Sequence, residues 1–311
     1  MPSWHILFDM EIRTLRYFAA VAREENMTRA AAQLHVSQPT LSKQMKALER
    51  ELGHKLFVRH SFSIELTEEG RLLRERAEDL IGLADRIEAD FLTLGDVTGG
   101  DLYLGLAESY QVGLLARQLK QLKQECPGLR YHVTSGDTEQ VTEKLDRGLV
   151  DFAAIVEEPD GERFSRYETL PLPVADRWGV VLRHDDALAG KKAVTVDDLA
   201  GLPLFCSEQS WARDIPAWAG SRMGELQLEG TFRLPYNGAV FAREGLGYLL
   251  TFDRLVDTSP SSGLAFRPLE PALESRMYLI WRRQQAQSPM AERFLERLRA
   301  SLADDDTLAA R

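Results

Sequence analysis

The chain contains little cysteine and no long apolar run. Of its 311 residues only Cys126 and Cys206 are cysteines, and no Cys-x-x-Cys pair is present. The sequence therefore indicates neither a disulfide framework nor a cysteine zinc site, and we expect both thiols to be buried as small hydrophobic groups. The first residues, MPSWHILFD, lack the basic region of a signal peptide, and no later segment approaches a membrane span. We therefore expect no membrane contact and a cytoplasmic location.

The sequence also lacks the common catalytic motifs. It contains no Gly-x-Ser-x-Gly, no Walker phosphate loop and no His-Glu-x-x-His, and its six histidines include no i, i+4 pair. The glycines of GGDLYLG do not have the spacing of a dinucleotide-binding turn. We therefore predict that the chain is not an enzyme and that it holds no cofactor and no metal.

The net charge at first argues against a nucleic-acid partner, because it is −10 at pH 7. The acidity is not uniform, however. Residues 1–66 contain nine basic against seven acidic side chains, whereas residues 67–95 contain four against eight. Local charge governs where a phosphate can approach, so the first segment remains a candidate surface for nucleic acid.

The first fifty residues show the pattern of three short helices. Apolar side chains recur at helical spacing in residues 12–24. Thr28 is the predicted N-cap of an alanine-rich second helix that ends near Leu34. Ser37 is the predicted N-cap of a third helix, which Gly53 would end in the left-handed conformation.

The third predicted helix has two unlike faces. Apolar side chains at intervals of four, three and four form one stripe: Leu41, Met45, Leu48 and Leu52. Basic, hydroxyl-bearing and small side chains lie on the opposite side: Pro39, Ser42, Lys43, Lys46 and Arg50. Any surface helix places charge opposite an apolar stripe, so this helix alone leaves open whether the basic face binds a partner or is merely solvated.

A small β-rich run follows the three helices. Residues 55–67, KLFVRHSFSIELT, contain two short apolar stretches around a turn at residues 60–63, which predicts a two-stranded wing. Helix, short helix, tight turn, helix and wing together make a winged helix-turn-helix, whose second motif helix enters the major groove of DNA. This combination favours DNA binding by the basic face.

A long helix with a heptad pattern is predicted for residues 67–95, with Thr67 as its cap. Its apolar positions alternate at intervals of four and three: Leu73, Ala77, Leu80, Ala84, Ile87, Phe91 and Leu94. This is the spacing of a coiled-coil seam, so we predict that two chains associate through it. Packing of the helix on its own domain is the alternative. As a helix the segment would extend about 43 Å.

A glycine-rich break at residues 95–101 precedes an alternation of strand-like and helix-like segments. Up to about residue 156 this alternation predicts a parallel sheet with helices on its faces. A second such unit runs from about residue 159 to residue 263, and the last strand and helix are expected to return to the first unit. We therefore expect a multidomain α/β protein with a two-lobed second domain.

On these residues the sequence resembles the LysR-type transcriptional regulators. The framework AAxxLxxSQPxLSxQxxxLExxLGxxLFxR at residues 30–59 is highly specific for that family, and the resemblance extends from Met10 to about Leu302. It implies an N-terminal winged helix-turn-helix, a long dimerising linker helix and a two-lobed effector domain that resembles periplasmic binding proteins. These parts would occupy residues 10–66, 67–95 and 96–304, with lobe I at about 100–157 plus 264–304 and lobe II at about 158–263.

The resemblance also assigns residues to DNA. The contacts would come from the recognition helix and its entry, the start of the preceding helix and the wing: Ser37, Gln38, Pro39, Thr40, Ser42, Lys43, Lys46, Thr28, Arg29 and Arg59. Glutamine can read adenine edges, hydroxyls and ammonium groups reach phosphates, and arginine can enter the minor groove. The wing continues with His60-Ser61-Phe62-Ser63, where family members often carry more basic residues, so we expect weak wing contacts.

Three loops at strand ends are the predicted ligand site of the second domain. In open α/β lobes a ligand lies at the carboxyl ends of strands, where helix N-termini present donors. The loops that meet this condition contain Glu108, Ser109, Tyr110, Ser135, Gly136, Asp137, Thr138, Ser207, Glu208 and Gln209. For each residue taken singly, turn formation or helix capping is the alternative. We expect Trp211 and Trp218 in the core rather than in the cleft.

Two hypotheses of different class result. The first is a sequence-specific regulator that binds an interrupted inverted repeat in double-stranded DNA and is controlled by a small-molecule effector. It would be a homodimer, with a homotetramer implied by the resemblance and RNA polymerase as a further partner. The second is a stand-alone small-molecule binding protein or enzyme whose N-terminal helices serve assembly only. The SQPTLSKQMK face joined to a wing and a heptad helix favours the first.

Overall fold

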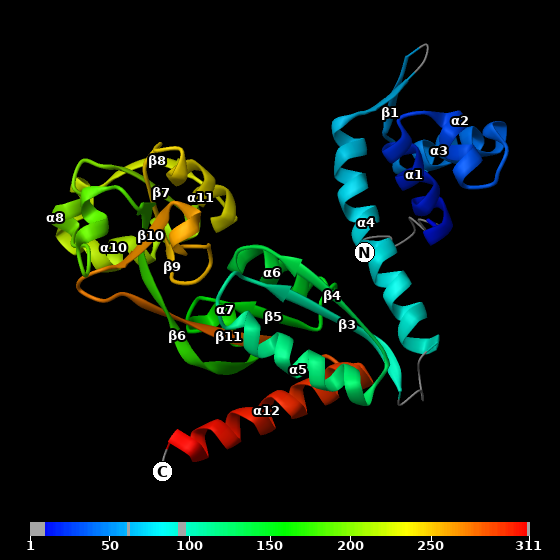
Figure 1. The fold of residues 1–311 in the computed structure, drawn as a ribbon. Coiled ribbons are helices and arrows are strands. Elements are labelled where there is room, and N and C mark those ends of the chain that lie inside the picture. Colours follow the sequence, from blue (N-terminus) through cyan, green and yellow to red (C-terminus); the bar gives the residue numbers. More distant parts are fainter. Residues whose placement is uncertain (1–9, 61–62, 93–97, 310–311) are drawn as a thin grey trace. The chain divides into compact units, whose positions relative to one another are not determined.

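The computed structural model describes residues 10–60, 63–92 and 98–309. The chain forms two compact units, the first ending at Leu94 and the second beginning at Gly95 (Figure 1). Each unit has apolar cores of its own. Within the described ranges, no helix combines the length and the apolar character that a membrane crossing requires.

The first unit is a helical domain with a two-stranded wing. Its elements are α1 (Ile12–Glu24), α2 (Met27–Gln33), α3 (Gln38–Leu52), β1 (Phe57–Arg59), β2 (Ile64–Leu66) and α4 (Glu68–Leu92). One core joins the helices, and on α3 it takes in Leu41, Met45 and Leu48. The predicted apolar stripe therefore holds α3 against α1 and α2, which leaves the opposite side of α3 free.

Side-chain caps define the ends of α2 and α3. The N-cap of α2 is Asn26 and not Thr28: the Asn26 Oδ1 accepts from the backbone N–H of Thr28 at 2.9 Å and of Arg29 at 3.0 Å. The prediction placed the cap two residues late, because Asn26 is the residue with extended backbone and Thr28 is already helical. The caps predicted for α3 are confirmed, since Ser37 accepts from the Thr40 N–H and Gly53 has a φ of 71°.

Helix α4 buries its early apolar positions in its own domain and leaves later ones exposed. Its second half still contacts α1 through the ion pair of Asp85 with Arg16. Ala77 is 0% exposed in the core of the first unit, and Leu73 packs against the same core. The side chain of Ala77 is therefore taken up by the core of its own unit, and the predicted contact of Ala77 with a second chain stays a prediction. Further along, Leu80, Ile87 and Phe91 are 43%, 50% and 72% exposed. Leu94 lies outside the described residues.

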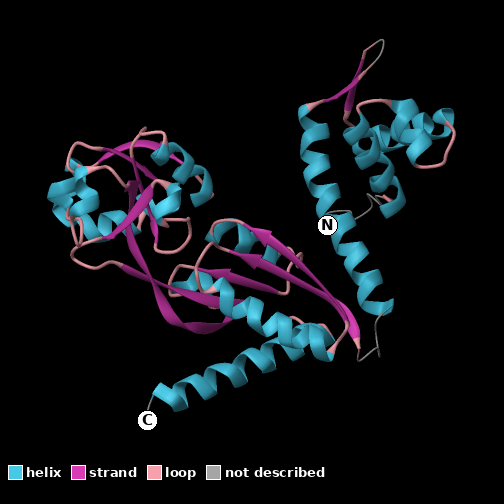
Figure 2. Ribbon diagram, viewed as in Figure 1, coloured by secondary structure: helices cyan, strands magenta, loops and turns pink. Residues whose placement is uncertain are grey.

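The second unit has two lobes. Lobe I contains β3 (Gly99–Leu106), α5 (Val112–Glu125), β4 (Gly128–Ser135), α6 (Thr138–Asp146), β5 (Phe152–Ile155), α7 (Gly161–Phe164), β11 (Glu274–Arg282) and α12 (Pro289–Ala309). Lobe II contains η1 (Ala187–Gly190), α8 (Val196–Leu199), β7 (Pro203–Cys206), α9 (Glu208–Ala212), α10 (Asp214–Ala219), η2 (Gly220–Glu225), β8 (Gln227–Thr231), α11 (Pro235–Arg243), β9 (Tyr248–Phe252), η3 (Pro260–Ser262) and β10 (Leu264–Pro268). The long strand β6 (Tyr167–Arg183) belongs to both (Figure 2).

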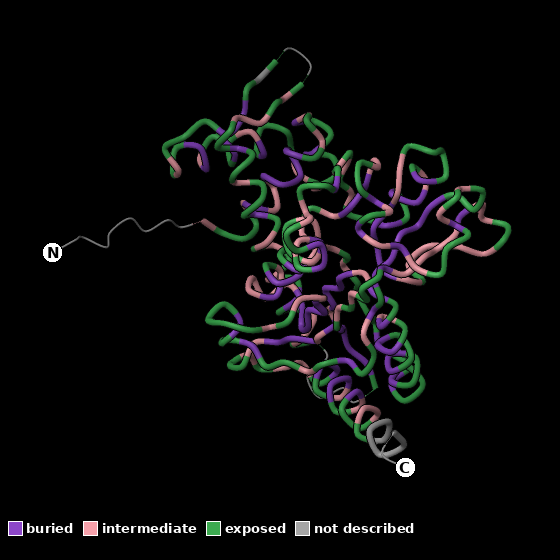
Figure 3. The backbone as a smooth tube through the Cα atoms, turned by 90° about the vertical axis from the view of Figure 1, so that its left-hand side faces the viewer, coloured by how far each residue is buried: buried purple, intermediate pink, exposed green. Residues whose placement is uncertain are grey.

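The strands follow the order β4-β3-β5-β11-β6-β9-β7-β8, with β10 also paired to β6. The predicted parallel pairing is confirmed where β3 lies beside β4 and β5 and where β7 lies beside β8 and β9. Strands β6 and β11 run antiparallel to their neighbours, because they carry the chain to lobe II and back. Strands β3 and β5 are buried almost throughout, whereas the edge strand β4 is largely exposed. Buried and exposed segments alternate along the chain (Figure 3).

The crossover between the lobes differs from the predicted one. Phe164 and Tyr167 pack with Val141 and Ile280 in lobe I, although they were assigned to lobe II. Conversely, β10 pairs with the lobe II half of β6, and Leu269 lies in the lobe II core. The chain therefore crosses within β6 and again just before β11, where paired strands connect the two lobes.

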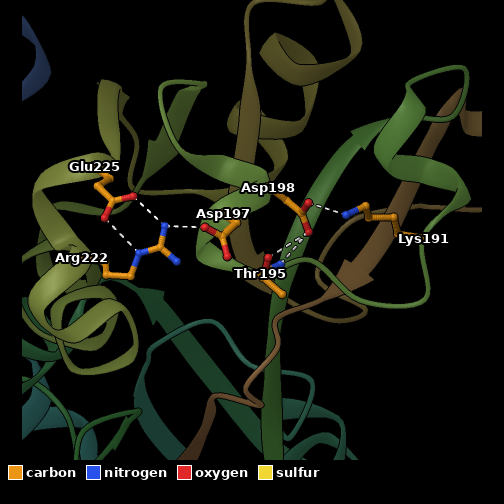
Figure 4. Close-up of polar contacts among 6 residues, drawn as sticks. All are labelled: Lys191, Thr195, Asp197, Asp198, Arg222 and Glu225. Carbon is orange, nitrogen blue, oxygen red and sulfur yellow. Dashed lines mark hydrogen bonds and ion pairs between the residues drawn. The ribbon is translucent and has the colours of Figure 1, made fainter.

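Polar contacts fix the outer helices of lobe II (Figure 4). Thr195 and Asp198 form the capping box that begins α8, and Lys191 forms an ion pair with Asp198. Arg222 bridges α8 and η2 by bonding Asp197 at 2.6 Å and Glu225. The two ion pairs of Arg222 are exposed, and exposed ion pairs add little stability.

Candidate functional site

The free side of α3 carries the residues predicted to contact DNA. Ser37, Gln38, Pro39, Thr40, Lys43 and Lys46 are exposed, whereas Ser42 is half-buried. The Lys46 carbonyl oxygen accepts from the Arg50 guanidinium at 3.2 Å, but the ammonium groups of Lys43 and Lys46 bond no described residue. Both ammonium groups are therefore available to a partner. Gln44, which the prediction omitted, is also exposed on this helix.

The predicted DNA contacts outside α3 differ in how free their side chains are to bind a partner. Thr28 is exposed at the start of α2. The Arg29 guanidinium bonds the Glu24 carboxylate at 3.1 Å and also the Glu24 carbonyl oxygen, so it is partly engaged within the domain. Arg59 ends β1, and its side chain lies outside the described part of the chain.

Glu49 ties the recognition helix to the wing. Its carboxylate accepts from the Leu56 N–H at 3.0 Å and from Lys55 Nζ at 3.0 Å. Burial opposes the charge, but the hydrogen bonds from Lys55 and from the backbone N–H groups of Leu56 and Phe57 prevail and lower the pKa of Glu49. The orientation of α3 relative to β1 therefore depends on a buried carboxylate.

A cavity of about 380 Å³ lies between the two lobes of the second unit. Most of the predicted ligand residues line it: Glu108, Ser135, Gly136, Asp137, Thr138, Ser207 and Gln209. The three loops converge because β3, β4 and β7 all end at this side of their sheets. Glu208 lines an adjoining pocket of about 290 Å³ instead.

Ser109 and Tyr110, which were also predicted as ligand residues, are not among the residues that line this cavity. Ser109 is buried, and its hydroxyl donates to the Asp176 carboxylate on β6, while the Tyr110 N–H donates to Asp176 at 3.2 Å. Burial raises the pKa of Asp176, although these two hydrogen bonds oppose the rise. The Tyr110 ring lies 4.7 Å from the Arg254 guanidinium. Both residues therefore link the lobes beside the crossover.

A pair of hydrogen bonds closes one side of the cavity. The Gln209 Oε1 on α9 accepts from the Thr138 N–H at 3.1 Å, and the Gln209 Nε2 donates to the Thr138 Oγ1 at 3.2 Å. Asp137, just before Thr138, caps α6 by accepting from the Gln140 N–H at 2.9 Å. We call the Thr138–Gln209 pair the clasp, because it joins lobe I to lobe II directly.

The charges around the cavity are mostly paired. Glu157 forms ion pairs with Arg163 and Arg213. Glu108 differs: burial raises its pKa, and it makes no hydrogen bond or ion pair with any described residue. Arg233, at the other wall, likewise has no partner among the described residues.

The sequence did not indicate several of the residues that line the cavity. Trp178, in the middle of β6, and Phe252, at the end of β9, form an apolar wall with ring centroids 4.5 Å apart. Phe232 and Arg233 follow β8, a strand that the apolar pattern did not reveal. Trp218 is buried in the lobe II core, and Trp211 packs against that core, as expected.

Comparisons with known proteins match both units. The model of the LysR substrate binding domain matches residues 95–303. The model of the bacterial regulatory helix-turn-helix proteins of the lysR family matches residues 12–71.

Two solved structures share the fold. The crystal structure of full-length CbnR complexed with its target DNA has a TM-score of 0.73 at 22% identity and covers 94% of this chain and 100% of that chain. A mutant of OxyR from Corynebacterium glutamicum has a TM-score of 0.55 at 23% identity and covers 96% and 94%.

Curated relatives carry regulatory names. The probable cat1 operon transcriptional activator of Acinetobacter lwoffii is 36% identical over 46% of this chain and 47% of that protein. The hydrogen peroxide-inducible genes activator of Pectobacterium carotovorum subsp. carotovorum is 32% identical over 64% of this chain and 65% of that protein. The match thus spans half to two thirds of those relatives. Because a family model covers most of its length, the chain belongs to the LysR family of helix-turn-helix proteins.

Proposed function

We propose that the chain is a sequence-specific DNA-binding transcriptional regulator controlled by a small molecule in the inter-lobe cavity. The observation that carries the proposal is the exposed basic side of α3, where the ammonium groups of Lys43 and Lys46 bond no described residue. The buried stripe of α3 holds this side outward, next to a wing. A stand-alone binding protein would have no use for such a face.

On DNA, the residues of α3 divide by chemistry. The amides of Gln38 and Gln44 suit adenine edges in the major groove. Lys43 and Lys46, with the hydroxyls of Thr28 and Thr40, suit phosphate oxygens, which set register but carry no sequence information. We call the first unit, with its helices α1 to α4 and its wing, the head. The DNA specificity of the head would depend on the two glutamines, and its DNA affinity on the two lysines.

Two chains would pair through the apolar side of α4, formed by the exposed Leu80, Ile87 and Phe91 and the half-buried Ala84. A symmetric pair places two recognition helices on successive half-sites, so we expect an interrupted inverted repeat. Further association into a homotetramer and contact with RNA polymerase complete the proposal, with action in the cytoplasm where bacterial DNA is found.

Ligand control requires two arrangements of the lobes. A ligand shifts the balance only by its difference in affinity for the two states, and about 1–3 kcal/mol of coupling suffices for regulation. The clasp and the Ser109–Asp176 bond are the contacts that a change in lobe closure would make or break. We therefore expect ligand binding to change the contacts of these residues.

The names of the peroxide-responsive relatives do not transfer to this chain. A thiol that senses peroxide needs exposure and a low pKa. Cys126 and Cys206 are both buried and unbridged, and burial together with the charge of Asp214 raises the pKa of Cys206. We therefore propose that the signal is a bound ligand and not oxidation.

The test is an electrophoretic mobility shift with DNA from upstream of the gene itself. The full-length protein should bind this fragment more tightly than an unrelated fragment of equal length and composition, in the presence of excess competitor. Equal affinity for both fragments at several salt concentrations would contradict a sequence-specific regulator.

A further inference from the structure

The inter-lobe cavity contains two unpaired charges of opposite sign. Glu108 follows β3 in lobe I, and Arg233 follows β8 in lobe II. Neither side chain bonds any residue in the described part of the chain. Glu108 is half-buried, whereas Arg233 is exposed and also borders two neighbouring pockets. Each lobe thus contributes one charged side chain to the lining of the cavity.

The carboxylate of Glu108 differs from its acidic neighbours. Asp137 is used in capping α6, Asp176 accepts from Ser109, and Glu157 is paired with arginines. Glu108 is half-buried without compensation, and its raised pKa reflects that cost. A ligand that brings a positive charge and N–H donors to this carboxylate would remove the cost.

Arg233 is the matching group on the opposite lobe. The other arginines near the cavity are engaged, Arg213 with Glu157 and Arg254 with the ring of Tyr110. Arg233 is exposed, and among the described residues that line the cavity it is the arginine without a partner. Its planar fork fits a carboxylate through two parallel hydrogen bonds.

Between the two charges the walls are apolar and the volume is small. Trp178, Leu250, Phe252 and Leu255 form the apolar lining, and Ser135 and Thr251 add hydroxyls. A volume of about 380 Å³ is at the small end of the range for ligand pockets, which suits a metabolite of amino-acid size.

We propose that the cavity binds a small zwitterion, an α-amino acid or a similar amino carboxylate, with its ammonium against Glu108 and its carboxylate against Arg233. The inference rests on the proposed function in taking this cavity as the effector site. A simple carboxylic acid would leave Glu108 uncompensated, and a simple amine would leave Arg233 unused. Because the two charges belong to different lobes, the zwitterion also bridges them.

The test measures binding to the full-length protein by thermal shift, followed by calorimetry of each hit. The probes are the twenty α-amino acids, each beside its decarboxylated amine and its deaminated acid. We expect at least one amino acid to bind tenfold or more tightly than both of its partners. If a deaminated acid or an amine binds as tightly as its amino acid, or if no probe binds, the proposal is overturned.

Two variants separate recognition from folding. Glu108→Gln should weaken the amino acid about tenfold and remove its advantage over the deaminated acid, and Arg233→Met should remove its advantage over the amine. Glu244→Gln and Arg243→Met, at exposed positions on the outside of lobe II, are the matched controls and should change neither ratio. Unchanged ratios in the first pair overturn the assignment.

The mobility shift without added ligand distinguishes the two proposals. Loss of amino-acid binding in Glu108→Gln with intact DNA binding supports the zwitterion site and leaves the regulator standing. Amino-acid binding by a protein that selects no DNA sequence would support the ligand and reject the regulator.

Discussion

The head and the cavity recognise their proposed partners by opposite constructions. The head presents a convex face formed by one helix, with Gln38, Lys43 and Lys46 within a few turns. The cavity is concave, and its lining comes from segments spread between Ala107 and Leu255. A face on one helix depends on local sequence, whereas the cavity depends on the pairing of distant strands. The two should therefore respond separately to substitution.

The largest expected effect comes from preventing dimerisation. DNA binding by the head needs a second chain, whereas ligand binding in the cavity does not. Changing Leu80 and Ile87 together to Asp places charges in the exposed apolar side of α4, so the protein should become monomeric. Since two half-sites are then no longer held together, affinity for the upstream DNA should fall more than 100-fold. Analytical ultracentrifugation checks the mass.

The control for this pair is Glu78→Ala, which removes an exposed side chain on the opposite side of α4. It should remain dimeric, and ligand binding by the cavity should be the same in all three proteins. A double-Asp variant that stays dimeric at low concentration would remove α4 as the dimer contact.

The next largest effect concerns the basic side chains on the convex face of α3. Changing Lys43 and Lys46 to Ala should weaken binding to all DNA about 10- to 100-fold and reduce the salt slope by about one unit per lost phosphate contact. Titrations at several salt concentrations measure both. Arg13→Ala, on the exposed side of α1, is the control. An unchanged slope in the double variant would place both lysines away from phosphate.

A smaller effect separates the stabilities of the two units. Glu49→Ala leaves the Leu56 N–H without its acceptor and should lower the unfolding free energy of the first unit by about 1–3 kcal/mol. The folded pKa lies below the ordinary 4.5, so the contribution is present above pH 4.5 and is lost as pH falls through the folded pKa. Amide hydrogen exchange in α3 and in β3 measures the two units separately.

Glu51→Ala, at an exposed position two residues along α3, is the control and should have no such effect. Equal loss of protection in α3 and β3 would mean that the units unfold together, and the contrast between head and cavity would then not extend to stability.

The helices of the head could be predicted because their signals lie within a few residues of one another in the sequence. Ser37, Gly53 and the stripe on α3 follow from capping preferences and helical spacing, which depend on residues a few positions apart. The misplaced cap has a local reason as well, because Asn26 is a better cap than Thr28. A heptad pattern cannot say whether Ala77 meets a second chain or the helix beside it.

For the cavity, the sequence predicted only those lining residues that follow from one topological rule. The rule that parallel strands present their carboxyl ends at one edge brought the loops of β3, β4 and β7 together. It could not orient Ser109, which turns to Asp176 on a strand 67 residues away. Nor could it place Trp178 and Arg233, because their positions depend on the crossover within β6 and on a strand with little apolar signal.

The smallest effect concerns the free carboxylate of the cavity. The folded pKa of Glu108 lies above the ordinary 4.5, so the folded protein holds this proton more tightly and loses stability as pH rises through the folded pKa. Glu108→Gln cannot ionise and should therefore raise the Tm at pH 7 by about 1–2 °C, since the group is half-exposed. Thermal melts from pH 4 to pH 8 should show the advantage vanish below pH 4.5.

Asp101 in the same lobe provides a control of opposite sign. Hydrogen bonds from Arg130 and His132 lower its pKa against the opposing effect of burial, so it stabilises the fold above the ordinary 3.8. Asp101→Asn should therefore lower the Tm at pH 7. If Glu108→Gln also lowers it, Glu108 has a partner in the folded protein, and the ligand cannot be the group that compensates its charge.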